Sequence, residues 1–235
     1  MSIELFDIDR GYAVFSKDNY ETAKHAHYAI EIVCCTKGSF SITTNLAEYA
    51  HIKSVIIPSN LSHRFNCINA ACDLLFLDPL SDTGKYFLQQ YDLVSQKSII
   101  VNPPELNRFH NKGKFDISLI LNKAGTNRPL QIDSRISICL QTINALVADQ
   151  KLTISQLSKA SFLSESRLAH LFKKQLGISV HQCILWKKML LAVLKSREGY
   201  SLTECAHHVG FSDSSHFNKV FYRMFGVNPF FVLKD

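Results

Sequence analysis

The C-terminal half of the chain repeats one pattern twice: TISQLSKASFLS at residues 153–164 and SLTECAHHVGFS at residues 201–212. Each copy is followed by a basic amphipathic segment, residues 165–176 and 213–225. A short helix, a tight turn and a second helix with one polar face are typical of a helix-turn-helix. The sequence therefore predicts two helix-turn-helix units in tandem.

Residue types that begin and end helices stand at matching places in both units. Both units open with a capping box, in which a hydroxyl and a side chain three residues on satisfy each other's free amides; the pairs are Thr153 with Gln156 and Ser201 with Glu204. We expect Ser164 and Asp213 to cap the second helices. Gly177 and Gly226 stand where a left-handed C-terminal cap would end those helices.

The second helix of each unit is expected to face duplex DNA, because a helix-turn-helix presents this element to base edges in the major groove. The predicted base contacts are Ser166, Arg167, His170, Ser214, Ser215, Asn218 and Lys219. Cationic side chains one turn further on are better placed for phosphate; they are Lys173, Lys174 and Arg223. The apolar positions are expected to form the core, namely Leu168, Leu171, Phe172, Trp186, Phe211, Phe217, Val220, Phe221 and Phe225.

An apolar-rich helix from Ser179 to about Ser196 is predicted between the two units. Eighteen residues make a helix about 27 Å long, and successive major grooves on one face of B-DNA lie roughly 34 Å apart. Such a rod is long enough to hold both second helices near adjacent grooves of one duplex. A further core helix is expected at about residues 132–149, where apolar residues fall three or four apart.

The charge is unevenly distributed along the 235 residues, which carry a formal net charge of +6. Residues 1–130 hold 13 basic and 13 acidic residues, whereas residues 131–235 hold 13 basic and 7 acidic ones. This pattern favours a sensor or scaffold joined to a module that binds a polyanion, although an ordinary solvated basic surface remains the alternative.

Cysteine usage and the N-terminus indicate the compartment. The seven cysteines are scattered without a C-x-x-C pair, which suits a reducing cytosol. Charged residues interrupt the start of the chain, and no stretch reaches the ~18–20 apolar residues that span a bilayer. We therefore expect a cytoplasmic protein without a signal peptide or a membrane partner.

The N-terminal half predicts a different architecture. Short period-two bursts between Tyr12 and Leu77 indicate an antiparallel sheet or small barrel. Helices are expected at 82–94, 104–111 and 115–123. Residues 124–129 are typical of a linker, so the predicted domains are 1–125 and 126–235. The expected fold class is α+β with two domains.

The C-terminal motifs resemble the AraC/XylS family of bacterial transcription regulators. The resemblance covers about the last hundred residues and rests on LSESRLAHLFKK at 163–174, WKKM at 186–189, GFSDSSHFNKVF at 210–221 and FGVNP at 225–229. It implies promoter binding by two helix-turn-helix units and contact with RNA polymerase. Phe162 stands where the first turn often has glycine, which predicts a slightly different turn. His170 and Lys219 replace common arginines, so the base preference does not carry over.

A second resemblance covers residues 20–77. His25, His27, Glu31 and His63 are similar to the ligand set of the cupin barrel, with Gly38 well spaced and Asn60 in place of a usual glycine. In one strand, the first three would point to the same side. Such ligands would suit a divalent transition metal.

Three alternatives to a metal site stay open, and no cofactor is required. One is a pocket for a small organic effector, lined by some of His25, His27, Glu31, Cys35, His63 and Phe65. Another is a barrel used for homodimerisation only. The last is a sensor based on the thiols of Cys35 and Cys67.

These patterns predict a sequence-specific DNA-binding transcription regulator with an N-terminal cupin-like domain for sensing and dimerisation, and not an enzyme. The rival from another class is a metal-dependent cupin enzyme with appended helices that localise it to DNA. A DNA-binding protein that has no ligand is the third candidate.

Overall fold

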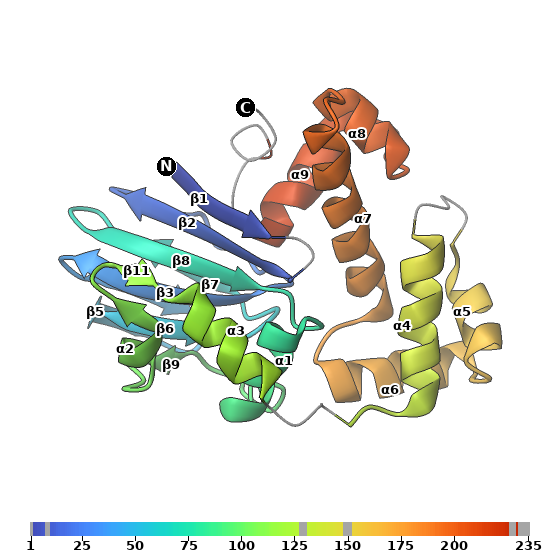
Figure 1. Cartoon of the computed structure of the whole chain (residues 1–235), viewed down its shortest axis with the longest axis horizontal. Coiled ribbons are helices and arrows are strands. Elements are labelled where there is room, and N and C mark those ends of the chain that lie inside the picture. The colour runs from blue at the N-terminus through green and yellow to red at the C-terminus, as the bar shows by residue number, and fades with distance from the viewer. Residues whose placement is uncertain (1, 8–9, 127–130, 148–151, 226–228, 230–235) are drawn as a thin grey trace. The chain divides into compact units, whose positions relative to one another are not determined.

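The computed structural model describes residues 2–7, 10–126, 131–147, 152–225 and 229. The chain divides into two compact units, Met1–Leu130 and Gln131–Asp235. The N-terminal unit is built on antiparallel sheets and the C-terminal unit is helical (Figure 1). The predicted α+β fold class is confirmed.

Two sheets form the N-terminal unit. One has the strand order β1-β2-β8-β3-β6-β9 and the other the order β5-β4-β7. The bounds are β1 Ser2–Asp7, β2 Tyr12–Asp18, β3 Ile30–Lys37, β4 Phe40–Thr44, β5 Glu48–Ile52, β6 Ser54–Ile57, β7 His63–Asn66, β8 Ala71–Leu77 and β9 Ile100–Val101. All paired strands in these sheets are antiparallel, as the period-two bursts predicted.

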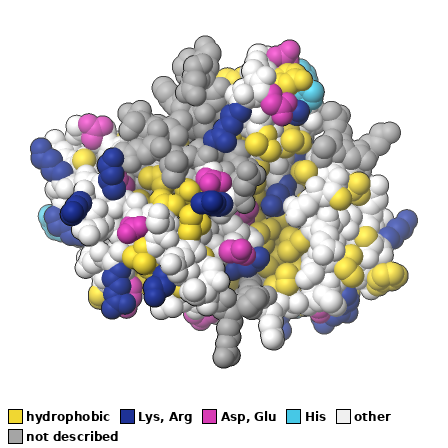
Figure 2. Space-filling view, viewed as in Figure 1, with side chains coloured by type: hydrophobic (Ala, Val, Ile, Leu, Met, Phe, Trp, Pro, Cys, Tyr) yellow, Lys and Arg dark blue, Asp and Glu magenta, His cyan; other side chains and the backbone are white. Residues whose placement is uncertain are grey.

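Three helices cover one face of the six-stranded sheet (Figure 1): α1 Asp82–Gln90, α2 Leu106–Phe109 and α3 Ile117–Gly125. Their buried side chains join those of the sheet in one core, where Ile32, Leu75 and Phe87 are almost completely shielded from solvent. Alternate strand residues point to the opposite face, so Glu31 lies on the other side of β3 from Ile32. On the outer surface, Lys and Arg are interspersed with Asp and Glu (Figure 2).

The helices predicted at 82–94 and 104–111 are shorter in the structure. Helix α1 ends at Gln90, and Asp92 has a left-handed φ of 48°. Helix α2 ends at Phe109 and is followed by a hairpin of β10 His110–Asn111 and β11 Lys114–Phe115. His110 also contacts Asp73 of β8, with 2.8 Å between Nε2 and Oδ2. The contact joins residues 37 positions apart. The apolar spacing that predicted a helix here reports only on neighbouring residues and therefore could not indicate it.

The C-terminal unit matches the predicted order of helices. It contains α4 Ser134–Leu146, α5 Ile154–Ala160, α6 Glu165–Leu176, α7 Val180–Arg197, α8 Leu202–His208 and α9 Ser214–Phe225. Both predicted capping boxes are present. Ser164 caps α6, and Gly177 ends it with a φ of 71°. The predicted cap at Gly226 and the side chain of Phe225 lie outside the described residues.

In the described parts of the chain, no single helix is long and apolar enough to cross a membrane. Helices α6 and α7 pass the test of length and composition only as a pair, and they are bent by 68° where they meet.

Candidate nucleic-acid interface and histidine cluster

Helix α6 buries its large apolar residues and exposes most of its polar ones. Leu168, Leu171 and Phe172 are buried in the core of the C-terminal unit. The predicted DNA contacts are all exposed: Ser166, Arg167, His170, Lys173 and Lys174. The N-terminal half of α6 therefore presents neutral and cationic donors to solvent, and two lysines follow in its last turn.

Helix α9 repeats this arrangement. Phe217, Val220 and Phe221 are buried. The predicted contacts divide into two groups: Ser215, Lys219 and Arg223 are exposed, whereas Ser214 and Asn218 are half-buried. Among the described residues, the Oδ1 atom of Asn218 is shielded from solvent and has no hydrogen-bond partner. The amide nitrogen is the other polar atom of this side chain.

The turns of the two helix-turn-helix units have the same backbone hydrogen bonds. Phe162 N donates to Lys159 O at 3.2 Å, and Gly210 N donates to His207 O at 3.0 Å. Phe162 has a φ of 54° and Gly210 a φ of 82°, so both are left-handed. The prediction of a different first turn is therefore wrong, because Phe162 adopts the conformation for which glycine is usually needed.

Helix α7 connects the two helix-turn-helix units. It has 18 residues, which makes it about 27 Å long at 1.5 Å per residue. It contacts α6, which precedes it, and α8, which follows it (Figure 1). Ser179 and Gln182 form a third capping box at its start. It was not predicted, although its residue pattern is that of the other two. The buried Trp186 and Met189 anchor α7 in the core.

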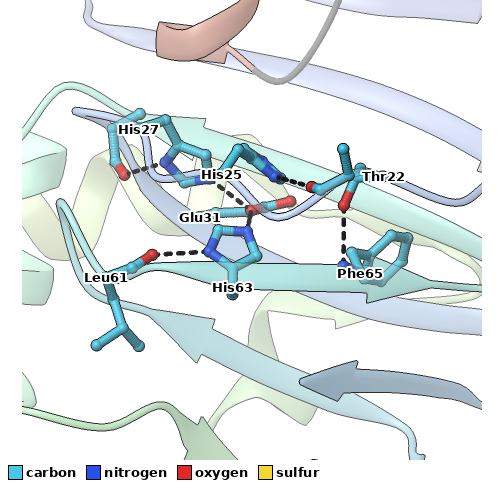
Figure 3. A network of polar contacts seen from close by, with 9 residues as sticks. Thr22, His25, His27, Glu31, Leu61, His63 and Phe65 are labelled. Carbon is cyan, nitrogen blue, oxygen red and sulfur yellow. Dashed lines mark hydrogen bonds and ion pairs between the residues drawn. The ribbon is translucent and has the colours of Figure 1, made fainter. Parts of the chain in front are cut away.

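In the N-terminal unit, three histidines converge on one carboxylate (Figure 3). The Oε2 atom of Glu31 lies 2.8 Å from His27 Nε2 and 3.3 Å from His63 Nε2. The ring centroid of His25 lies 4.5 Å from that of His63. One nitrogen from each histidine falls within 4.8 Å of the others. The structure therefore brings together all four residues of the predicted ligand set.

Each imidazole in this cluster is oriented by a backbone carbonyl. The Nδ1 atoms of His25, His27 and His63 lie 2.9, 2.9 and 2.8 Å from the oxygens of Ala23, Ala29 and Leu61. Since a carbonyl only accepts, each Nδ1 carries hydrogen. The Nε2 atoms are therefore left to face the cluster, as in histidines that bind metals with the other ring nitrogen donating to a carbonyl.

The electrostatics of the cluster favour a charged pair. Burial acts to raise the pKa of Glu31, yet hydrogen bonds from His27 and His63 and their positive charges hold it well below its usual range. Burial acts to lower the pKa of His63, but the hydrogen bond and charge of Glu31 raise it overall. Burial, followed by the neighbouring His63 and His27, lowers the pKa of His25 to about 4.

The backbone segments that carry the histidines are not those expected from the sequence. Only Glu31 lies in a strand of the six-stranded sheet, because β3 begins at Ile30. His25 forms an isolated bridge with His63, and His27 lies on the irregular segment between them and β3. The prediction that one strand aligns all three residues is therefore wrong. Asn60 fills the usual glycine position with a φ of 63° and donates from its N to His27 O at 2.8 Å.

The two remaining predicted pocket residues, Phe65 and Cys35, have other contacts. Phe65 packs against Phe40 with ring centroids 5.3 Å apart, and Cys35 donates to the carbonyl oxygens of Lys37 and Ala71. A surface hollow of about 650 Å³ lies nearby, but none of the six predicted pocket residues lines it; its lining residues are Glu21, Thr22, Ala23, Lys24, Thr43 and Arg64.

Comparison with known proteins places the C-terminal unit in a family. Residues 157–234 match the family model described as "Helix-turn-helix domain". The chain is 37% identical over 81 residues to a probable transcriptional regulator, LumQ, of Photobacterium leiognathi, covering 34% of this chain and 33% of that protein. It is 34% identical over 103 residues to the arabinose operon regulatory protein of Escherichia coli K12, covering 42% and 34%. The C-terminal unit is therefore an AraC-type helix-turn-helix domain.

The matched stretch spans only about a third of each of these relatives. Over 95% of both chains, the fold is similar to wild-type ToxT from Vibrio cholerae bound to an unsaturated fatty acid, with a TM-score of 0.61 and 13% identity. A second ToxT structure, from strain O395, has a TM-score of 0.57 at 12% identity over 95% of this chain and 98% of that one. The two-domain fold is thus shared with ToxT.

Proposed function

We propose that this protein is a sequence-specific DNA-binding transcription regulator of the bacterial cytoplasm. The observation that carries the proposal is the matched pair of exposed polar faces on α6 and α9, placed at the two ends of one 18-residue helix. The relatives of the C-terminal unit are transcription regulators, which favours this function over the metal-dependent enzyme. We assign residues 126–235 to DNA binding and residues 1–125 to sensing and dimerisation, with promoter DNA and RNA polymerase as partners.

Binding to duplexes of about two helical turns tests this proposal. A library selection followed by fluorescence anisotropy would measure affinity for the best duplex and for a scrambled duplex of the same composition. Affinity for the best duplex should be at least about 10³-fold higher and should fall steeply as salt rises, because phosphate contacts release counterions. Equal affinity for both duplexes and for heparin would contradict the proposal.

We further propose that a small molecule bound in the N-terminal unit controls DNA binding. The fatty acid bound to ToxT supports an organic effector in this fold. A ligand that prefers one arrangement of the N-terminal unit would shift the populations of DNA-competent and incompetent states. If the histidine cluster belongs to the effector site, His25→Ala with His27→Ala should abolish the effector response and leave DNA affinity without effector unchanged. A response that survives would exclude the cluster from that site.

A divalent transition metal is the second candidate ligand, favoured by the orientation of the three imidazoles. His25, His27 and His63 would bind through Nε2, with Glu31 as the fourth ligand. The donor set fits, because imidazole and carboxylate ligands suit such ions. Cobalt(II) would test it through its visible absorption: a bound ion should give a tetrahedral or five-coordinate spectrum that His63→Ala removes. The matched control is His181→Ala, an exposed histidine of the other unit, which should leave the spectrum unchanged.

A further inference from the structure

Helices α6 and α9 begin in the same way but present different side chains. Ser164 accepts a hydrogen bond from Arg167 N at 3.3 Å, and Asp213 accepts one from His216 N at 2.7 Å. A fully buried apolar residue follows each of the two donor residues. Arg167 and His216 therefore occupy equivalent positions near the start of the two helices, and both are exposed.

The two equivalent positions differ in charge. An arginine guanidinium stays charged at every physiological pH, whereas histidine is the side chain whose charge changes between about pH 5 and 8. The difference extends to the whole helix-turn-helix unit, because residues 153–177 hold four basic and one acidic residue but residues 201–225 hold two of each. While its histidines are neutral, the second unit therefore has no formal net charge, and a protonated histidine adds attraction for the DNA polyanion.

The surroundings of His216 hold its ring on one side and leave the residue exposed. The ring meets that of Phe211 edge to face, with 5.1 Å between the centroids. Asp213 stays ionised, because the hydrogen bond from the backbone amide of His216 lowers the pKa of its carboxyl. Helix α8 packs against α9, and the other acidic, basic and histidine side chains of these two helices are Glu204, His207, His208, Lys219 and Arg223. Two of these are histidines, so their titration has to be separated from that of His216.

We propose that protonated His216 contacts a guanine in the major groove, so that the second helix-turn-helix unit binds its half-site more tightly as the pH falls. The proposal rests on the DNA-binding function proposed above and adds His216 to the expected base contacts. A protonated imidazole carries hydrogen on both nitrogens and only donates. Guanine is the base that presents two acceptors, N7 and O6, at its major-groove edge. A hydrogen bond from a cationic donor is also about twice as strong as one from a neutral donor.

The direction of the pH effect follows from the proton balance. DNA binds the protonated form of His216 more tightly, so the complex holds more protons than the free protein in the range where histidine titrates, about pH 8 to 5. Affinity therefore rises as the pH falls, by at most about tenfold per pH unit for one proton. We expect a total gain of about tenfold between about pH 8 and pH 6, the size of one good base contact.

Anisotropy titrations of the full-length protein across this pH range test the proposal, on the duplex selected at the lower pH and on its scrambled counterpart. His216→Gln should abolish the gain, because an amide does not titrate. His216→Arg should keep tight binding and remove the pH dependence, because its charge is permanent. Both variants retain the backbone amide that donates to Asp213, and the replaced side chain is exposed, so the fold is kept. The matched controls are His207→Gln with His208→Gln on α8 and His181→Gln on α7, which replace exposed histidines and should keep the gain.

Modified DNA separates a base contact from a phosphate contact. Replacing each guanine of the duplex in turn with 7-deazaguanine, which lacks the N7 acceptor, should remove the gain at one position only. The proposal would be overturned by a gain that no such replacement removes, by an equal gain on the scrambled duplex, or by a gain that persists in His216→Gln. Selective binding that does not change with pH would overturn it as well, and would leave the DNA-binding function intact. Failure to bind any duplex selectively at either pH would contradict both.

Discussion

Phe162 occupies the left-handed position of the first turn and is 87% exposed. A non-glycine residue there costs about 1–2 kcal/mol, and an exposed phenyl ring buries nothing in return. Gly210 occupies the same position in the second turn without this strain. The repeat therefore tolerates a locally unfavourable residue because the surrounding hydrogen bonds and buried side chains determine the turn.

Phe162→Gly should consequently raise the free energy of unfolding by up to about 1 kcal/mol. Relief of the backbone strain, about 1–2 kcal/mol, outweighs the greater freedom of glycine in the unfolded chain, about 0.5–1 kcal/mol. Urea denaturation would measure the change. Phe162→Ala is the matched control: it removes the ring but keeps Cβ, so it should not stabilise the protein. Equal gains from both variants would assign the effect to the ring.

Lys219 is an exposed cation on α9, the helix that we propose faces DNA in the second helix-turn-helix unit. If it contacts a base, Lys219→Ala should weaken binding to the preferred duplex by about 1–3 kcal/mol and relax the preference at one position. Anisotropy titrations on matched and scrambled duplexes would measure both effects. Lys123→Ala, an exposed lysine on α3, provides the control for a simple loss of charge. The same loss on every sequence would mean that Lys219 contacts phosphate.

His25 should make stability depend on pH. Its pKa is about 4 in the folded chain against an ordinary 6.5, so the unfolded chain takes up the proton first as the pH falls. The stability associated with neutral His25 is therefore complete above about pH 6.5 and is lost as the pH falls towards 4, with a slope of at most about 1.4 kcal/mol per pH unit. His25→Asn should flatten this part of a denaturation-against-pH curve. An unchanged slope would contradict the burial argument.

Capping residues define where the short helices begin. Helix α8 has only seven residues, and Ser201 and Glu204 satisfy each other's backbone amides at its start. Helices this short are marginal by themselves. The capping box therefore fixes the residue at which α8 begins. Because α8 leads directly into the second turn, the box also helps to place that turn.

Ser201→Ala should lower the free energy of unfolding by about 1 kcal/mol, because it leaves the amide of Glu204 without its acceptor. Thr203→Ala in the same helix removes an exposed hydroxyl with no capping role and should change stability by less than about 0.5 kcal/mol. Thermal or urea unfolding would separate the two. Similar losses in both variants would mean that the cap contributes little.

The length of α7 should fix the spacing of the two half-sites on DNA. If α6 and α9 enter adjacent major grooves, the two half-sites lie about one helical turn, roughly 10 bp, apart. Inserting about 5 bp between them turns one half-site to the opposite side of the duplex. We expect affinity to fall at least about tenfold and to return in part when a full turn is inserted, as measured by anisotropy. If inserted base pairs leave the affinity unchanged, only one helix-turn-helix unit binds DNA.

The helices of the C-terminal unit could be predicted from the amino-acid sequence alone. Its helices depend on local signals such as capping boxes, apolar periodicity and a terminal glycine, which act within a few residues. The buried and exposed faces of α6 and α9 follow from the same short-range pattern. The AraC-type identity was available for the same reason, since its motifs lie in single continuous stretches.

The arrangement of the N-terminal unit depends on contacts between distant parts of the chain and could not be predicted from the sequence. The sequence indicated the four residues of the histidine cluster, His25, His27, Glu31 and His63. It assigned the first three to one strand. A bridge to His63 and an irregular segment bring them together instead. It indicated Cys35 but not Cys72, which lies opposite Cys35 only because β3 and β8 are neighbours in the sheet. Strand pairing depends on contacts between residues far apart in the sequence. The alternation of apolar and polar residues predicts where a strand lies, but it does not predict which other strand pairs with it.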